Sequence, residues 1–357
     1  MKILTIIGAR PQFVKVAALS YVFKKYEEID EVILHTGQHF DSGMSDVFFD
    51  ELEIPKPKYN LNLGGLSHGA MTGRMMEQIE TVSIQEKPDM VLVFGDTNST
   101  IAGALAAKKN HIEVAHVEAG LRSFNMSMPE EINRILTDRI SDYLFCPTEM
   151  AINNLKNEGF DSFKAQMVLS GDVMNDAVKI FENRSVMPSV ELRNEFILCT
   201  LHRAENTDDL VKLADIISAL NTISEDQQII LPMHPRTRNI ILKSKLKISG
   251  NLIIINPVSY FEMLYLLKNC SLVMTDSGGL QKEAYFLTKP CITLREETEW
   301  VELVENGYNI LSGSSFDVIL KAYIDSKIFN KDFSHNFYGN GNACDIIAKT
   351  LLNIKLN

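Results

Sequence analysis

The stretch Asp89–Val117, DMVLVFGDTNSTIAGALAAKKNHIEVAHV, contains two apolar runs on either side of an alanine-rich segment with helical spacing. We predict a strand over 89–95, a helix over 98–109 and a second strand over 112–117. This order and these lengths are typical of a βαβ unit, whose two strands pair in parallel.

The same alternation continues on both sides of this unit. Further strands are expected at 3–7, 31–36 and 142–147, and further helices at 12–25, 67–87 and 129–140. After a loosely patterned linker at 180–195, strands are expected at 196–201, 228–232, 252–255, 271–275 and 291–294. Repeated strand–helix order predicts an α/β protein with parallel sheets that are covered on both faces.

We therefore predict two Rossmann-like lobes, 1–175 and 195–330. A last helix within 331–357 can return to either lobe. In open α/β sheets, ligands bind beyond the carboxyl ends of the strands. The polar clusters lie at such ends, so the site is expected in a cleft between the lobes.

Composition excludes several classes of function. A chain of 357 residues exceeds what one hydrophobic core usually organises, and 45% hydrophobic with 23% charged residues is ordinary for a globular protein. The net charge of −11 argues against a broad nucleic-acid or anionic-membrane surface. The apolar runs are too short for a membrane span or a signal peptide. Five widely spaced cysteines without C-x-x-C favour buried thiols, no metal site and a cytoplasmic, reducing location.

Four polar clusters follow expected strands or open expected helices in the first lobe. Arg10 and Lys15 place two cations at a helix start, where a phosphate or carboxylate binds well. Asp96 lies between a strand and a helix, and its alternative role is a helix N-cap. Glu118 follows an apolar strand, and its alternative role is a buried ion pair with Arg122. Glu130 belongs to a Pro-Glu-Glu helix opening, which also suits the helix dipole.

The second lobe contains a nucleotide-type turn. Residues 275–283, TDSGGLQKE, follow an apolar strand and open a helix, so the amides near Ser277, Gly278 and Gly279 suit a phosphate. Glu283 lies further along that helix and is placed to accept ribose hydroxyls. A structural glycine-rich turn is the alternative.

Two further basic groups follow strands of this lobe. His202 adjoins an arginine and a glutamate, and His234 lies in the basic segment MHPRTR. Arg295 opens a mixed-charge loop that also fits a solvated surface.

Six motifs, found in one order along nearly the whole chain, resemble the non-hydrolysing UDP-N-acetylglucosamine 2-epimerases. They are GARP at 8–11, GDTNST at 95–100, HVEAGLR at 116–122, PEEINR at 129–134, DSGGLQKE at 276–283 and ETE at 297–299. The resemblance implies the GT-B architecture, a UDP-sugar substrate and a homodimer.

The resemblance also implies roles by position. Acid–base work falls to the carboxylates Asp96, Glu118 and Glu130, with His202 near the leaving pyrophosphate. The UDP-binding set is Arg10, Lys15, His202, Met263, Ser277, Gly278, Gly279, Glu283 and Arg295. Arg74 and His234 match a second, regulatory sugar-nucleotide contact of bacterial members.

Two departures favour one branch of the family. Glu299-Trp300-Val301-Glu302 replaces the usual segment after the ETE motif, and Met263 stands where an aromatic residue usually packs near uracil. With the segment SFNMSM, these changes resemble the branch that epimerises UDP-2,3-diacetamido-2,3-dideoxy-glucuronate for bacterial surface polysaccharides.

The chemistry at C2 limits the mechanism. C2 of a 2-acetamido sugar is not acidic, so inversion requires transient oxidation or elimination. No G-x-G-x-x-G follows a strand, which argues against nicotinamide, and we expect no cofactor. A carboxylate base, a clamp on the departing UDP and a second carboxylate fit elimination and re-addition. A GT-B glycosyltransferase, a hydrolysing epimerase and a non-catalytic sugar-nucleotide sensor are the alternatives.

Overall fold

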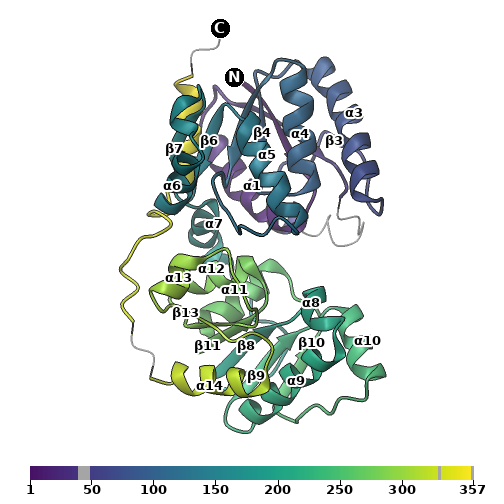
Figure 1. The fold of residues 1–357 in the computed structure, drawn as a ribbon, viewed down its shortest axis with the longest axis vertical. Helices are drawn as coiled ribbons and strands as arrows, with labels where there is room; N and C mark the ends of the chain where they lie inside the picture. The colour runs from purple at the N-terminus through teal and green to yellow at the C-terminus, as the bar shows by residue number, and fades with distance from the viewer. Residues whose placement is uncertain (39–48, 329–330, 355–357) are drawn as a thin grey trace. The chain divides into compact units, whose positions relative to one another are not determined.

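The computed structural model describes residues 1–38, 49–328 and 331–354, which fall into two compact units (Figure 1). The first unit comprises residues 1–180 and 336–357, and the second comprises 181–335. The chain therefore leaves the first unit once and returns to it near the C-terminus.

The first unit is built on a sheet of seven strands in the order β3-β2-β1-β4-β5-β6-β7, all paired in parallel. Its central strands are almost continuous runs of buried Ile, Leu, Val and Phe, as expected where helices cover both faces. The strands are β1 (Lys2–Ile7), β2 (Asp30–His35), β3 (Tyr59–Asn60), β4 (Met90–Phe94), β5 (Glu113–Val117), β6 (Tyr143–Cys146) and β7 (Gln166–Leu169).

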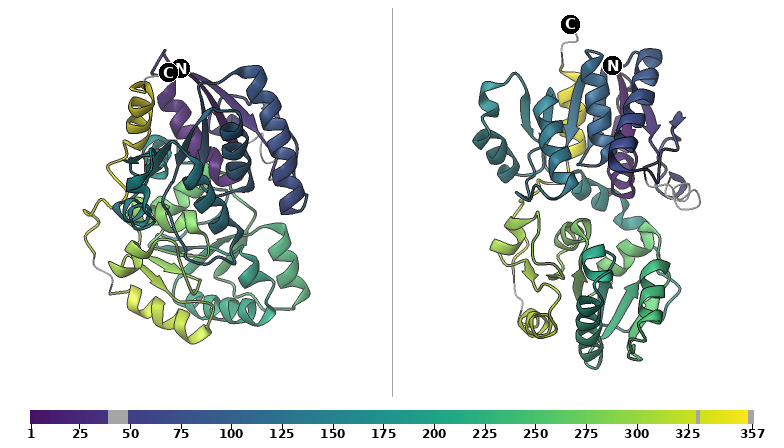
Figure 2. Two further views of the ribbon diagram at one scale, coloured as in Figure 1. Left: turned by 45° about the horizontal axis from the view of Figure 1, so that its top comes forward. Right: turned by 45° about the vertical axis from the view of Figure 1, so that its right-hand side comes forward.

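Helices cover both faces of this sheet. On one face α3, α4 and α5 lie side by side, and α15 packs against α1 on the other, where the yellow and purple helices adjoin in Figure 2. The helices are α1 (Arg10–Phe23), α3 (His68–Glu86), α4 (Asn98–Lys109), α5 (Pro129–Ile140), α6 (Glu149–Asn157), α7 (Val173–Phe181) and α15 (Ala343–Leu352).

The second unit has a parallel sheet of six strands in the order β10-β9-β8-β11-β12-β13. Separate apolar clusters lie on its two faces, one including α9 and α14 and the other α11 and α12. The strands are β8 (Phe196–Thr200), β9 (Gln228–Pro232), β10 (Leu252–Ile255), β11 (Leu272–Thr275), β12 (Cys291–Thr293) and β13 (Asn309–Leu311). The helices are α8 (Ala204–Thr207), α9 (Leu210–Ser224), α10 (Pro235–Lys243), α11 (Tyr260–Asn269), α12 (Gly278–Phe286), α13 (Val301–Glu305) and α14 (Phe316–Ser326).

Both sheets reverse their strand order at the first strand of the unit. In the first sheet β1 lies between β2 and β4, and in the second β8 lies between β9 and β11. Such a switch point leaves a crevice at the carboxyl ends of the two strands that flank it. The predicted fold class, two Rossmann-like lobes with parallel sheets, is confirmed.

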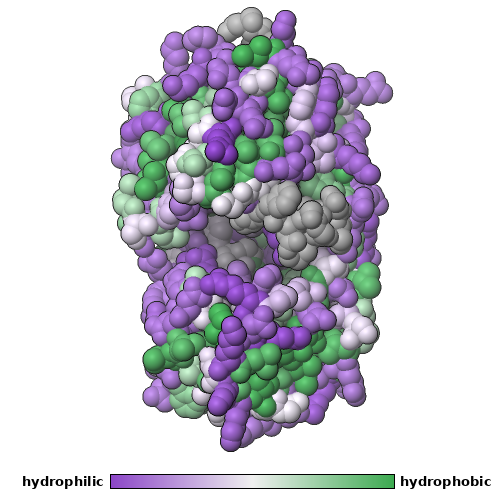
Figure 3. Space-filling view, turned by 90° about the vertical axis from the view of Figure 1, so that its right-hand side faces the viewer, coloured by the Kyte–Doolittle hydropathy of each residue, from purple (hydrophilic) through white to green (hydrophobic). Residues whose placement is uncertain are grey.

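The surface and the cysteines agree with the composition. Hydrophilic residues predominate on the face drawn in Figure 3, with hydrophobic residues in separate patches. The five cysteines are buried and free. Among the described residues, no helix combines the length and the apolar character that a membrane span requires.

Candidate active site

Two carboxylates come together at the carboxyl ends of adjacent strands in the first unit. Asp96 follows β4 and Glu118 follows β5, and these strands pair directly. A methyl group placed on Gly95 would lie 3.4 Å from Glu118 Oε2, so the Glu118 carboxylate packs over the residue next to Asp96. Glu118 is only 6% exposed, whereas 29% of the Asp96 side chain is exposed.

Each of these carboxylates faces a cation. Lys15 on α1 pairs with Glu118 Oε2, and Arg134 on α5 pairs with Asp96 Oδ2. Thr97, not Asp96, caps α4, because its hydroxyl accepts the backbone N–H of Thr100. Asp96 is therefore not the N-cap of α4, so the capping alternative is wrong. Its carboxylate is not used in capping and can take another role.

Arg122 does not form the buried pair with Glu118 that the sequence offered as an alternative. It binds Glu158 through Nε and Nη2 and donates from Nη1 to Asp138 at 2.7 Å instead. Asp138 in turn bonds Nδ1 of His116 at 2.7 Å, and His116 Nε2 contacts the carbonyl of Gly95, also at 2.7 Å. This buried chain supports the turn that carries Asp96.

The backbone at this edge of the sheet is held in an uncommon conformation. Glu118 has φ +68°, in the left-handed region that non-glycine residues rarely adopt. Such strain persists only where the surroundings enforce it, and it is concentrated at functional sites. It turns the chain immediately after β5 and fixes the position of the Glu118 side chain.

The two glutamates that open α5 have different environments. Glu130 is exposed, whereas Glu131 is fully buried and bonds Arg134 at 2.7 Å. Glu130, the predicted third carboxylate, is therefore accessible to a ligand. Among the other predicted residues of this unit, Arg10 opens α1 with a partly buried side chain and Arg74 is exposed on α3.

In the second unit, His202 is oriented by a buried aspartate. His202 follows β8, and Asp276 follows the neighbouring strand β11. The Asp276 carboxylate lies 3.1 Å from His202 Nδ1 and accepts the backbone N–H of His202 at 3.0 Å. Burial acts to raise the pKa of Asp276, but the hydrogen bond and charge of His202, with the amides of His202 and Arg203, lower it overall. A fixed Nδ1 leaves Nε2 of this half-exposed imidazole for a ligand.

The predicted phosphate turn forms the N-terminus of α12. Ser277 is the N-cap, and its hydroxyl oxygen accepts the backbone N–H of Leu280 at 3.4 Å. A methyl group on Gly279 would meet no atom within 4 Å among the described residues, so the backbone there is open. On Gly278 it would lie 3.6 Å from the Glu299 carboxylate. Open amides at a helix N-terminus suit an anionic group.

Arg295 and the only tryptophan of the chain lie beside this turn. Arg295 pairs with Glu299 at 2.9 Å, and its buried Nε has no hydrogen-bond partner among the described residues. Trp300 donates from Nε1 to the Gly278 carbonyl at 2.8 Å. Lys282, which is almost fully buried, lies over the indole ring at 4.1 Å. Arg295, Lys282 and the Glu299 carboxylate therefore all lie near the start of α12.

The remaining predicted residues of this unit lie on different elements. Glu283 is buried on α12 beside Tyr260, whose pKa is raised by burial and by that carboxylate. Met263 on α11 is partly buried against the core under the sheet. His234 is the exposed N-cap of α10, and its Nδ1 accepts the Arg236 N–H at 3.2 Å.

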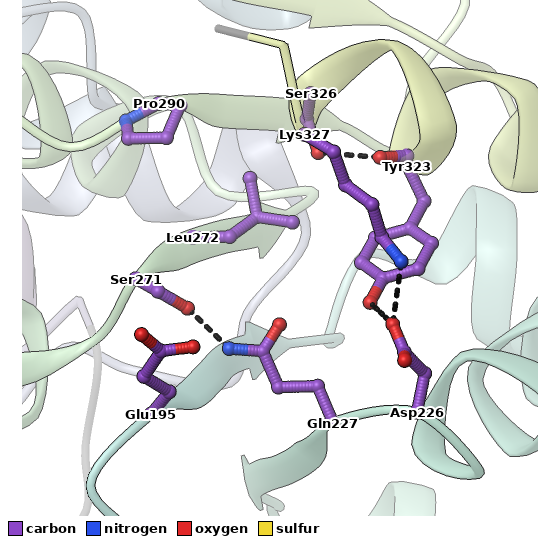
Figure 4. A pocket seen from close by; sticks show the side chains of 9 residues that line it. All are labelled: Glu195, Asp226, Gln227, Ser271, Leu272, Pro290, Tyr323, Ser326 and Lys327. Carbon is purple, nitrogen blue, oxygen red and sulfur yellow. Dashed lines mark hydrogen bonds and ion pairs between the residues drawn. The ribbon is translucent and has the colours of Figure 1, made fainter.

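A polar pocket of about 380 Å³ lies at the opposite edge of the second sheet, where the strands begin (Figure 4). Gln227 donates to Ser271, while Tyr323 and Lys327 both bond Asp226. These groups mostly satisfy one another, and the pocket is at the amino ends of the strands. It is therefore a weaker candidate than the carboxyl-end residues.

Three features of the candidate site were not predicted from the sequence. They are the Lys15–Glu118 pair, the bridge from Arg134 to Asp96 and the support of His202 by Asp276. Each joins residues far apart in the chain, although all of them except Lys15 and His202 lie in the quoted motifs. Among the described residues, no cluster of His, Cys, Asp or Glu side chains is arranged to hold a metal ion.

Comparisons with known proteins extend over nearly the whole chain. A family model described as UDP-N-acetylglucosamine 2-epimerase matches residues 22–352. The chain is 54% identical over 353 residues to UDP-2,3-diacetamido-2,3-dideoxy-D-glucuronate 2-epimerase of Pseudomonas aeruginosa, with 98% of this chain and 99% of that relative covered.

Two solved structures are similar over the same length. The crystal structure of Methanocaldococcus jannaschii UDP-GlcNAc 2-epimerase in complex with UDP-GlcNAc and UDP has 44% identity and a TM-score of 0.85, covering 99% of each chain. UDP-GlcNAc 2-epimerase from Neisseria meningitidis, bound to UDP-GlcNAc, has 32% identity and a TM-score of 0.88, covering 99% of this chain and 100% of that one.

Proposed function

Since this chain belongs to the UDP-N-acetylglucosamine 2-epimerase family, we propose that it inverts C2 of a UDP-2-acetamido-2-deoxy sugar by eliminating UDP and adding it back. The observation that carries this proposal is that Asp96 and Glu118 follow the carboxyl ends of adjacent strands, each beside a cation. The reaction needs two acid–base groups at one carbon, and two neighbouring carboxylates meet that need.

In the first half of the reaction, a carboxylate of the set Asp96, Glu118 and Glu130 takes the proton from C2. The C1–O bond to UDP breaks as a C1–C2 double bond forms, so UDP departs with the bonding electrons. Anion-binding groups favour this departure because negative charge develops on the leaving diphosphate. We assign the stabilisation of the departing diphosphate to Arg10, His202 and the open amides at the start of α12.

In the second half, another carboxylate of the set donates a proton to C2 on the opposite face. The diphosphate oxygen of UDP then bonds again to C1, and the product is the C2 epimer with its UDP linkage restored. No electron is transferred to or from the sugar overall. The reaction therefore needs no redox cofactor.

The substrate class is proposed from the departures in the sequence and from the relative in Pseudomonas aeruginosa. That relative is named for UDP-2,3-diacetamido-2,3-dideoxy-D-glucuronate, and it is 54% identical to this chain. We assign the same nucleotide here, with the product serving bacterial surface polysaccharide synthesis. UDP-GlcNAc is the second candidate, since the relatives with solved structures are named for it.

Incubation in D₂O with each nucleotide, followed at C2 by NMR, tests the proposal. We expect deuterium at C2, inversion and a retained UDP linkage, with faster exchange on the diacetamido-glucuronate nucleotide. Release of UDP with free sugar would indicate a hydrolysing enzyme. Sugar transfer only when an acceptor is added, without exchange, would indicate a glycosyltransferase.

Three accompanying properties are proposed from the family resemblance alone. They are a homodimer, a cytoplasmic location and a second nucleotide contact at Arg74 and His234. Light scattering on purified protein tests the first. Activation of the epimerase by added UDP-GlcNAc, and its loss in His234→Ala, tests the third.

A further inference from the structure

The buried glutamate of the α5 opening holds a loop in place. Glu131 is fully buried, and its carboxylate accepts the backbone N–H of Ser123 at 3.0 Å and that of Phe124 at 2.9 Å. These amides belong to the loop that joins Glu118 to Glu130. The side chain is therefore fully engaged within the protein, unlike its exposed neighbour.

That loop contains a strained residue. Phe124 has φ +57° and is 78% exposed, although a large apolar side chain in the left-handed region is uncommon. The hydrogen bonds from the backbone N–H groups of Ser123 and Phe124 to the Glu131 carboxylate help to hold this conformation. The position of the loop thus depends on the position of Glu131.

Arg134 connects this clamp to the proposed acid–base group. It lies one helical turn after Glu131, is 4% exposed, and donates from Nη1 to Glu131 and from Nη2 to Asp96 Oδ2. Asn133 on the same helix donates to the Asp96 carbonyl at 2.9 Å. Helix α5 therefore fixes both the backbone and the side chain of Asp96.

The planar guanidinium explains why an arginine occupies this position. Its fixed fork presents two donors at once, so it can bridge two carboxylates in a defined geometry. A lysine supplies one flexible point charge and cannot set that geometry. The bond from Arg134 goes to Oδ2 of Asp96, and 29% of the Asp96 side chain is exposed. The Asp96 carboxylate therefore remains accessible.

We infer that Glu131 and Arg134 are positioning residues for the epimerisation proposed above: they hold the Asp96 carboxylate in one orientation and tie it to the 123–124 loop. The inference rests on the proposed function. Neither residue is assigned a contact with the sugar. Both act through Asp96.

The first test is the kinetics of Arg134→Lys, which keeps the positive charge but loses the second of the two N–H donor groups. We expect kcat for C2 exchange to fall on the order of 100-fold, as misplacement of a catalytic group by about 1 Å can do. We expect KM to change much less. Arg139→Gln is the matched control on the same helix, because Arg139 is exposed and contacts Phe160 and Phe163 instead.

A double-mutant cycle separates positioning from a general loss of structure. If Arg134 acts through Asp96, Arg134→Lys has no further effect on the residual exchange of Asp96→Asn. The fluorescence of Trp300, the only tryptophan, checks that UDP still binds in each variant. Should Arg134→Lys fail to fold, Glu131→Gln is the second variant, with the same side-chain shape and an expected loss in kcat.

The outcomes distinguish the inference from the function. Wild-type kcat in Arg134→Lys, or losses that multiply in the double variant, would overturn the positioning role alone. No C2 exchange in the wild-type enzyme would overturn the proposed function and this inference together. A loss in kcat that vanishes in the Asp96→Asn background supports it.

Discussion

At the residue scale, the candidate site depends on which cation each carboxylate faces. Lys15 reaches Glu118 from α1, and Arg134 reaches Asp96 from α5, so two different helices hold two neighbouring groups. Elimination and re-addition need one proton acceptor and one proton donor. The separate partners allow the two carboxylates to differ in orientation and access, as Glu118 is buried and Asp96 is partly open.

Asp96→Asn should lower turnover by about 10²–10⁴-fold, the usual contribution of an acid–base group. The amide keeps the shape of the carboxylate and still accepts from Arg134, so the fold should survive. Steady-state epimerisation and thermal unfolding on the same sample check this. Turnover close to the wild type would remove Asp96 from the mechanism.

His116→Asn should lower the free energy of unfolding by about 1–3 kcal/mol, the cost of leaving a buried polar group without its partner. Both imidazole nitrogens are engaged in the buried core, one by Asp138 and one by the Gly95 carbonyl. The shorter amide cannot reach both. Urea unfolding measures the loss.

His111→Asn is the matched control for that variant. His111 is exposed, with φ +59°, a conformation that asparagine tolerates well. Its unfolding free energy should stay within about 0.5 kcal/mol of the wild type, as for most surface changes. Equal losses in the two variants would show that the buried network contributes nothing of its own.

At the element scale, the turn after Glu118 requires glycine for two reasons. Gly120 has φ +79°, and a methyl group on it would lie 2.4 Å from the carbonyl oxygen of Ala151 in α6. Gly159 has a similar φ of +82° but open space around it. Comparing substitutions at the two glycines therefore separates the cost of backbone strain from the cost of a steric clash.

Gly159→Ala should cost about 1–2 kcal/mol of stability, the penalty for a left-handed non-glycine residue. Gly120→Ala should cost clearly more, because the Ala151 carbonyl on α6 would have to move as well. Chemical unfolding of the two variants measures the difference. Equal losses would mean that α6 shifts freely to accommodate the methyl group.

Long, strongly patterned elements were predictable from the sequence, whereas three of the short edge strands were not. The helices over 98–109 and 129–140 have the bounds that their spacing predicted. The strands β3, β7 and β13 were not predicted. They have two to four residues, and pairing with a neighbouring strand defines them more than their own pattern does.

At the scale of the whole molecule, the sequence motifs identified the candidate site residues. They predicted less well which other residues those side chains contact. Strand ends placed Asp96 and Glu118 together, because the carboxyl ends of parallel strands share one edge. The orientation of α5 about its own axis buries Glu131 and exposes Glu130, and packing against α4 sets that orientation. A Pro-Glu-Glu opening alone does not distinguish these two glutamates.

The stability of the molecule in acid should depend on another buried carboxylate, at the amino ends of the first sheet. Hydrogen bonds from Lys2, Lys58 and Tyr59 lower the pKa of Glu86 from its ordinary 4.5 to about 2. A lowered folded-state pKa stabilises the protein above the unfolded value, and that stability is lost as the pH falls. Wild-type stability should therefore decline between pH 4.5 and about 2.

Glu86→Gln should be less stable than the wild type at pH 7. The difference in unfolding free energy should shrink as the pH falls from 4.5 to about 2, and unfolding followed at several pH values measures it. Asp226→Asn is the matched control, since Asp226 also pairs with a lysine and a tyrosine but is 57% exposed. Exposed pairs contribute about 0–1 kcal/mol, so its effect should be small at every pH. A Glu86→Gln difference that does not change with pH would mean that the lost stability comes from packing and not from the charge of Glu86.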